Sequence, residues 1–105
     1  MRVGRGVMDR TYNINLWEEK DEHGRIQGCW AKIENDCLII SKERLYSSYM
    51  CFFDPENTKQ LFALLDVNNG PRDSILVSRF GGADGFTALL ELCKTNGINY
   101  ASHIE

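Results

Sequence analysis

The alternation of apolar and polar residues predicts that the first half of the chain is built from β-strands. Tyr12, Ile14 and Leu16 alternate with asparagines, a polar segment follows up to Gly24, and a second apolar segment then begins, as is typical of a β-hairpin. An Asn-Asp pair at 35–36 predicts the next turn. Strands joined in sequence order by short turns favour an antiparallel meander. The strands are expected at residues 11–16, 25–33, 37–40 and 45–53.

A helix is predicted to follow directly after the fourth strand. In residues 54–56, Asp-Pro-Glu, the aspartate can cap free amide groups, the proline fits the first helical position and the glutamate favours the positive end of the helix dipole. The loop Asn68-Asn69-Gly70-Pro71 is expected to end this helix. Its apolar stripe would consist of Leu61, Phe62, Leu64 and Leu65.

The remaining residues are predicted to form two strands around a second helix. A strand is expected from Ser74 to Phe80, and after two glycines Asp84 is expected to cap a helix that ends at Asn96-Gly97. Residues 98–103 would form the last strand. The helix is predicted because four apolar residues recur at the spacing i, i+3, i+4 and i+7, namely Phe86, Leu89, Leu90 and Cys93.

The resulting order ββββαβαβ predicts an α+β fold, with a mostly antiparallel sheet of about five to six strands and two helices packed on it. A chain of 105 residues has the size of one domain, so we expect a single domain over 1–105 with one core. Residues 1–9 contain two glycines and no periodic pattern, and they are expected to be an unstructured lead in which Met8 is a candidate native start.

Composition narrows the class of protein. The chain is 43% apolar and 26% charged, which excludes intrinsic disorder, and no apolar run approaches the roughly 18 residues of a membrane helix. Because no secretory segment is recognised either, we expect a cytoplasmic protein whose four cysteines are reduced thiols. The net charge is −3, and residues 11–105 carry 9 basic and 14 acidic side chains, or −5. This charge disfavours nucleic acid and anionic membranes as partners and favours a basic protein.

Cysteine and histidine are not arranged for metal binding or catalysis. No C-x-x-C pair occurs among Cys29, Cys37, Cys51 and Cys93, so the spacing of zinc ligands is missing. His23 lies in a predicted turn and His103 near the C-terminus, which are poorly fixed positions for a general acid or base.

The glycine-rich segment Gly81–Gly85 is the remaining candidate for a ligand site, because it follows a predicted strand and opens a helix. It lacks both the Walker lysine and the dinucleotide spacing, and Asp84 would repel a phosphate. We therefore expect a turn with a helix cap there, and a protein that is not an enzyme and has no cofactor or metal.

The feature that stands out is a run of acids at the end of the first hairpin, Glu18-Glu19-Lys20-Asp21-Glu22. Trp17 precedes it and falls out of step with the inward series Tyr12, Ile14 and Leu16, so it is expected to point to the other face with the asparagines. An exposed tryptophan beside carboxylates is typical of a binding surface with an aromatic anchor and a charged rim.

In size, acidity, the β-rich start Tyr12–Trp17 and the closing segment Ile75–Tyr100, the chain resembles the nuclease-toxin immunity proteins of contact-dependent growth inhibition systems. The resemblance implies a monomer that forms a 1:1 heterodimer with a cognate toxin domain, a basic nuclease, and covers its active site. Carboxylates would then mimic the phosphates of the nucleic-acid substrate. The residues that we expect to bind the partner are Trp17, Glu18, Glu19, Asp21, Glu22, Glu34 and Asp36.

Two other classes of protein stay open. A secretion chaperone or adaptor would also be small, acidic and α+β, but it would need an exposed apolar groove and would usually be a dimer. A small enzyme or ligand-binding module would need a pocket with converging polar groups, for which Tyr46, Tyr49 and His103 are candidates.

Overall fold

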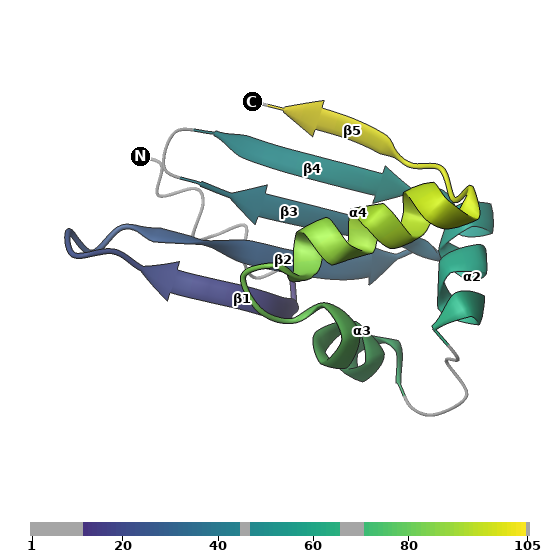
Figure 1. Cartoon of the computed structure of the whole chain (residues 1–105), viewed down its shortest axis with the longest axis horizontal. Helices are drawn as coiled ribbons and strands as arrows, with labels where there is room; N and C mark the ends of the chain where they lie inside the picture. The colour runs from purple at the N-terminus through teal and green to yellow at the C-terminus, as the bar shows by residue number, and fades with distance from the viewer. Residues whose placement is uncertain (1–11, 45–46, 66–70, 105) are drawn as a thin grey trace.

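A computed structural model describes residues 12–44, 47–65 and 71–104, and this part of the chain forms one five-stranded sheet and three helices (Figure 1). Neighbouring strands are antiparallel, and their order in the sheet is their order in the chain. The predicted α+β class and the predicted meander are confirmed. The strands are β1 (Ile14–Lys20), β2 (Ile26–Glu34), β3 (Cys37–Glu43), β4 (Ser48–Phe53) and β5 (Ala101–Ile104).

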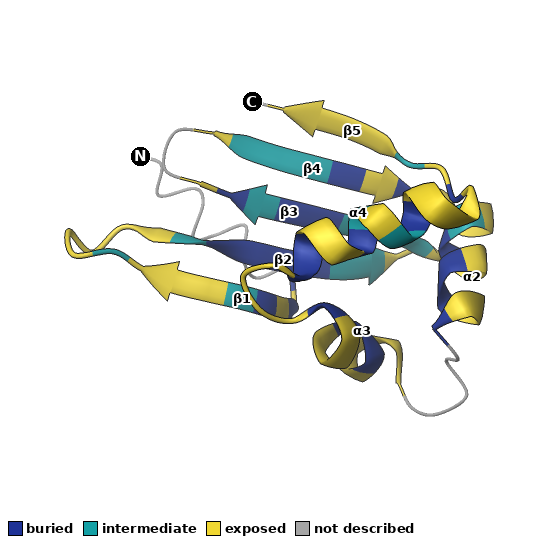
Figure 2. Cartoon of the chain, viewed as in Figure 1, coloured by how far each residue is buried: buried dark blue, intermediate teal, exposed yellow. Residues whose placement is uncertain are grey.

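The three helices pack on one face of the sheet. They are α2 (Pro55–Leu64), α3 (Arg72–Phe80) and α4 (Gly85–Asn96). Alternate residues of the strands, such as Ile14, Ala31 and Leu38, point to this face and form the core with apolar residues of the helices. Figure 2 shows that the buried residues of the helices face the sheet. We call this side of the sheet the helix face. The largest side chains that are fully enclosed in this core include Phe53, Phe62, Leu38, Ile40, Leu61, Leu76 and Leu89.

One turn and two helix ends follow their predicted residues. Asn35 and Asp36 both have positive φ angles, 53° and 65°, as a two-residue turn between antiparallel strands requires. Asp54 caps α2 through a 2.8 Å hydrogen bond that the amide of Asn57 donates to its Oδ1. Gly97 ends α4 in the left-handed conformation, with φ 70°, and its amide donates to the carbonyl of Cys93.

Asp84 occupies the N-cap position of α4, as predicted, but its side chain does not act as the cap. The Asp84 side chain makes no capping hydrogen bond, and the chain turns instead through Gly82, whose φ is 101°. Gly85 is required at the first helical position because a Cβ there would lie only 1.7 Å from the carbonyl oxygen of Phe80. The amide of Gly82 donates to the carbonyl of Leu16 at 2.9 Å, so this glycine-rich segment is fastened to the edge strand β1.

The predicted strand from Ser74 to Phe80 was wrong, because this segment is the helix α3. The helix buries Ile75, Leu76 and Phe80 and leaves Val77 45% exposed, whereas a strand would place Ile75 and Val77 on the same face. The sequence contains signals for a helix: Pro71 directly precedes it, Asp73 lies in its first turn and a basic residue in its last. The β-branched residues in the run favoured the strand, but packing against the sheet decides the structure.

The predicted orientation of Trp17 was also wrong. Two steps along β1, from Asn15 to Trp17, correspond to one step along β2, which is a β-bulge. As a result Trp17 lies opposite Cys29, a core residue, and shares the helix face with Leu16. Alternation from Tyr12 onward cannot reveal the extra residue.

Some expectations concern residues outside the described part of the chain. The proposed lead at 1–9 is one of them, and most of the predicted loop at 68–71 is another. Within the described residues, no helix has both the length and the apolar character that crossing a membrane requires.

Candidate partner-binding surface

The hairpin of β1 and β2 extends past the layer of helices (Figure 1). From Glu18 to Gln27 it contains no buried residue, and Figure 2 shows its end as almost entirely exposed. We call residues 18–27 the acidic hairpin. It contains Glu18, Glu19, Asp21 and Glu22, four of the seven residues predicted to bind a partner.

Asp21 closes the turn of the acidic hairpin. Its Oδ1 accepts hydrogen bonds from the amides of His23 (2.8 Å) and Arg25 (2.9 Å), and its Oδ2 lies 3.0 Å from Nε of Arg25. The backbone amide of Arg25, followed by that of His23 and the arginine charge, holds the pKa of Asp21 below its ordinary value although partial desolvation opposes this. Asp21 therefore shapes the hairpin, and its carboxylate is largely occupied.

The three glutamates have freer carboxylates. Glu18 accepts a 2.9 Å hydrogen bond from the side-chain amide of Asn15, and Glu22 lies 3.8 Å from Nε2 of His23 with both side chains well exposed. By register, Glu18 lies opposite Gly28 and Glu19 opposite Gln27, so their side chains leave the hairpin on opposite faces. The acids thus surround the hairpin instead of forming one flat patch.

Two apolar side chains accompany these acids. Trp17 is half-buried at the base of the hairpin on the helix face. Ile26, which the sequence analysis did not single out, lies opposite Lys20 and is 45% exposed. The sequence places Ile26 in an apolar segment, which marks it as a strand residue. The alternation of residues in that segment does not show whether its side chain points outward or into the core.

Glu34 and Asp36 are not close to the acidic hairpin. They lie at the other end of β2, and eight residue steps from Ile26 to Glu34 correspond to about 26 Å. Glu34 forms an ion pair of 3.3 Å with Lys32, whose Nζ also lies 5.0 Å from the centroid of the Tyr12 ring. The structure therefore divides the predicted site into an acidic hairpin at one end of the sheet and Glu34 with Asp36 at the other.

The three buried cysteines are not activated as nucleophiles. Burial raises the pKa of Cys29 to about 12 and the pKa values of Cys51 and Cys93 to about 11, so these thiols stay protonated. Among the described residues, no three His, Cys, Asp or Glu side chains lie close enough together to hold a metal ion.

Tyr46, Tyr49 and His103 were the candidates for lining a ligand pocket. The two that the structure describes, Tyr49 and His103, lie on opposite faces of the sheet. Tyr49 packs edge-on against Phe86 on the helix face, with ring centroids 5.5 Å apart. His103 lies opposite Met50, the residue after Tyr49, so its side chain leaves the other face of the sheet. Tyr46 is outside the described residues.

No protein-family model, curated protein or solved structure matches this chain. The function must therefore be inferred from the surface itself. On that surface the acidic hairpin combines exposure, charge and a fixed backbone, which are the properties expected of a contact made with another macromolecule.

Proposed function

We propose that this protein is an immunity protein, a cytoplasmic inhibitor that binds a cognate toxin domain one to one and covers its active site. The observation that carries the proposal is the acidic hairpin, which projects from the sheet and exposes Glu18, Glu19 and Glu22. A nuclease must bind the phosphates of its substrate with basic residues, so its active site attracts carboxylates.

The geometry of the hairpin suits entry into a cleft. Because Glu18 and Glu19 leave opposite faces, a hairpin inserted between two basic walls presents a carboxylate to each. The hydrogen bonds of Asp21 hold the turn before the partner arrives, so less conformational entropy is lost on binding.

Apolar contacts would supply the remaining affinity. Charged groups at the rim of an interface accelerate association, while buried apolar and aromatic side chains supply much of the binding energy. Ile26 is already 45% exposed within the acidic hairpin, and Trp17 lies at its base. We assign Ile26 the role of apolar contact and Trp17 that of a partly accessible anchor.

The proposal is tested with the C-terminal domain encoded by the reading frame directly upstream, prepared as a catalytically inactive variant. Association and dissociation rates are measured by stopped flow between low and high salt. For a variant with Glu18→Gln, Glu19→Gln and Glu22→Gln, we expect association at low salt to slow by about tenfold or more, with dissociation changed much less.

A matched control neutralises three other exposed acids with Asp73→Asn, Asp84→Asn and Glu91→Gln, which change the net charge by the same amount on α3, α4 and the segment between them. This variant should associate almost as fast as the wild type. Equal slowing in both variants would mean that only net charge matters, and it would remove the acidic hairpin from the proposed interface.

A further inference from the structure

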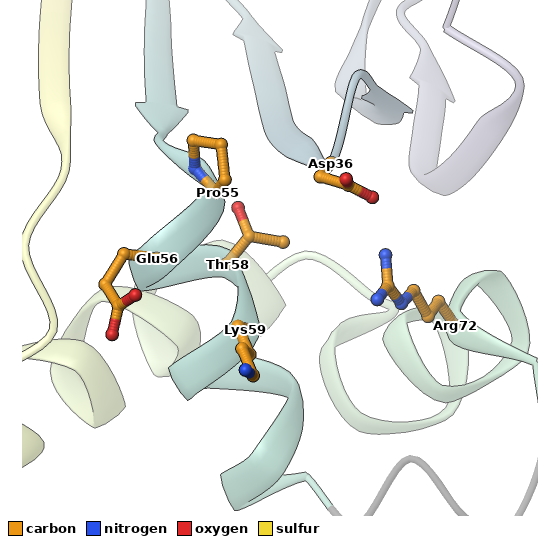
Figure 3. Close-up of a pocket in the computed structure, with 6 residues that line it drawn as sticks. All are labelled: Asp36, Pro55, Glu56, Thr58, Lys59 and Arg72. Atoms are coloured by element: carbon orange, nitrogen blue, oxygen red, sulfur yellow. The ribbon is translucent and has the colours of Figure 1, made fainter.

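A pocket lies at the opposite end of the sheet from the acidic hairpin. Its volume is about 350 Å³, and it is bounded by the turn between β2 and β3, the first turns of α2 and the start of α3 (Figure 3). This volume is near the lower limit of pockets that hold small molecules. The residues that line it are Asp36, Pro55, Glu56, Thr58, Lys59 and Arg72.

Opposite charges face each other across this pocket without meeting. Figure 3 shows Arg72 pointing from one wall toward Asp36 on the other, with Lys59 on α2 below them. Among the described residues, none of these three side chains comes within ion-pair distance, 4.0 Å, of an opposite charge. Glu56 is turned toward Gln60, whose side-chain amide donates to it at 3.3 Å. The pocket therefore has a carboxylate, Asp36, on one wall and a guanidinium, Arg72, on the other, while Glu56 and Lys59 add one charge of each sign on α2.

The Arg72 guanidinium and the backbone of Asp36 have defined positions before any ligand binds. The guanidinium carbon of Arg72 lies 5.1 Å from the centroid of the Phe62 ring, and this ring is itself buried. Stacking on an aromatic face leaves the N–H groups at the guanidinium edge available for an oxyanion. The backbone at Asp36 is set by its turn, where its φ of 65° is one that glycine normally adopts.

Thr58 closes the pocket from below. Thr58 is 1% exposed, and its hydroxyl is used, because it donates to the carbonyl of Phe53 and accepts from the amide of Leu38. Figure 3 shows the methyl group of Thr58 directed between Asp36 and Arg72. Because Thr58 is almost fully covered, a ligand would mainly contact the exposed side chains of the charged walls, with the Thr58 methyl group beneath it.

We infer that this pocket binds a small zwitterion of the α-amino acid class, with its carboxylate on Arg72 and Lys59 and its ammonium group on Asp36. A simple anion would be repelled by Asp36, and a simple cation by Arg72 and Lys59, whereas a ligand with both charges matches both walls. Since the pocket lies about 26 Å from the acidic hairpin, measured along β2, it is independent of the proposed partner surface.

The test is a titration of the ¹⁵N-labelled protein with L-alanine, acetate, methylammonium and inorganic phosphate, followed by two-dimensional NMR. L-Alanine should shift the amide signals of residues 35–37, 56–59 and 72–73 along a one-site curve. Acetate, methylammonium and phosphate should each bind at least about tenfold more weakly, because each meets only one wall. Absence of saturable shifts with L-alanine would overturn the inference.

Variants separate the zwitterion site from a plain anion site. Arg72→Gln and Asp36→Asn should each weaken L-alanine binding by about tenfold, and asparagine tolerates the left-handed backbone at position 36. Arg79→Gln, at the exposed end of the same helix, is the matched control and should leave binding unchanged. If Asp36→Asn strengthened binding, or if phosphate bound as tightly as L-alanine, the pocket would be an anion site and the inference would be wrong. The acidic hairpin is unchanged in these variants, so the two proposals fail separately.

Discussion

Thr58 joins the helix layer to the sheet through a single buried hydroxyl. The register places Leu38 of β3 directly opposite Phe53, the last residue of β4. The Thr58 hydroxyl stands between them: it accepts from the amide of Leu38 at 3.0 Å and donates to the carbonyl of Phe53 at 3.1 Å. A variant that removes the hydroxyl but keeps the shape, Thr58→Val, should leave both backbone groups buried without a partner.

The size of this effect follows from the two groups. A buried donor or acceptor left without a partner costs about 1–3 kcal/mol, and a carbonyl is tolerated somewhat better than an amide, so we expect Thr58→Val to lose about 2–4 kcal/mol. Thr58→Ser keeps both hydrogen bonds and should lose about 1 kcal/mol with its methyl group. Thr, Val and Ser have similar helix propensities, so α2 itself is hardly affected.

The assay is urea unfolding followed by circular dichroism. With a slope of about 1.5 kcal/mol per molar urea, Thr58→Val should lower the midpoint by about 1.3–2.7 M, and Thr58→Ser by less than about 1 M. The more apolar variant is thus expected to be the less stable one, against the usual trend for buried sites. A Thr58→Val protein at least as stable as Thr58→Ser would refute the reasoning.

Three further predictions concern the turn, the thiols and the response to acid. Asp36→Gly should stabilise the protein by up to about 1 kcal/mol and Asp36→Ala should destabilise it, because only glycine is free of strain at a φ of 65°; equal unfolding midpoints for the two variants would contradict this. In the native protein at pH 8, dithionitrobenzoate should modify half-buried Cys37 rapidly and the three buried cysteines, whose pKa values are raised to about 11 or 12, only on unfolding; fast release of more than one equivalent would contradict this. Hydrogen bonds from backbone amides lower the pKa values of Asp21 and Asp54 in the folded state below 3.8, so the stability they contribute is complete above that pH and is lost as the pH falls through the folded values. Asp54→Asn, which keeps a capping side chain, should therefore flatten the fall of the urea midpoint between pH 5 and pH 2.5, and an unchanged slope would contradict the assignment.

Features encoded in a few consecutive residues were predictable from the sequence. The Asp54-Pro55-Glu56 start of α2, the Asn96-Gly97 end of α4 and the Asn35-Asp36 turn all depend on local conformational preferences, and each is present in the structure. The same holds for the meander, because short turns leave few other ways to pair successive strands.

Features decided by tertiary packing were not predictable. The run Ile75-Leu76-Val77 fits a strand by its β-branched residues, yet it is helical because α3 buries one side against β1 and the sheet. The bulge near Trp17 reverses the expected face of that side chain through one extra residue, which alternation alone does not show.

In the candidate sites too, local features were predictable from the sequence and tertiary ones were not. The acids of the hairpin are adjacent in sequence, so their common exposure was predictable, but the capture of Asp21 by the amides of His23 and Arg25 depends on the turn geometry. Asp36 shares a pocket with Lys59 and Arg72 only because β2 carries it to the far end of the sheet, beside α2 and α3. No local pattern contains that pocket.

The proposal that the protein is an immunity protein is tested most directly by co-expression with the active toxin domain of the upstream reading frame, followed by titration calorimetry of the purified pair at low and high salt. The account predicts that cells survive only when the protein is present, and that the complex is one to one and weakens as salt rises. Cell death despite co-expression, or a pair that does not bind at micromolar concentration, would contradict it.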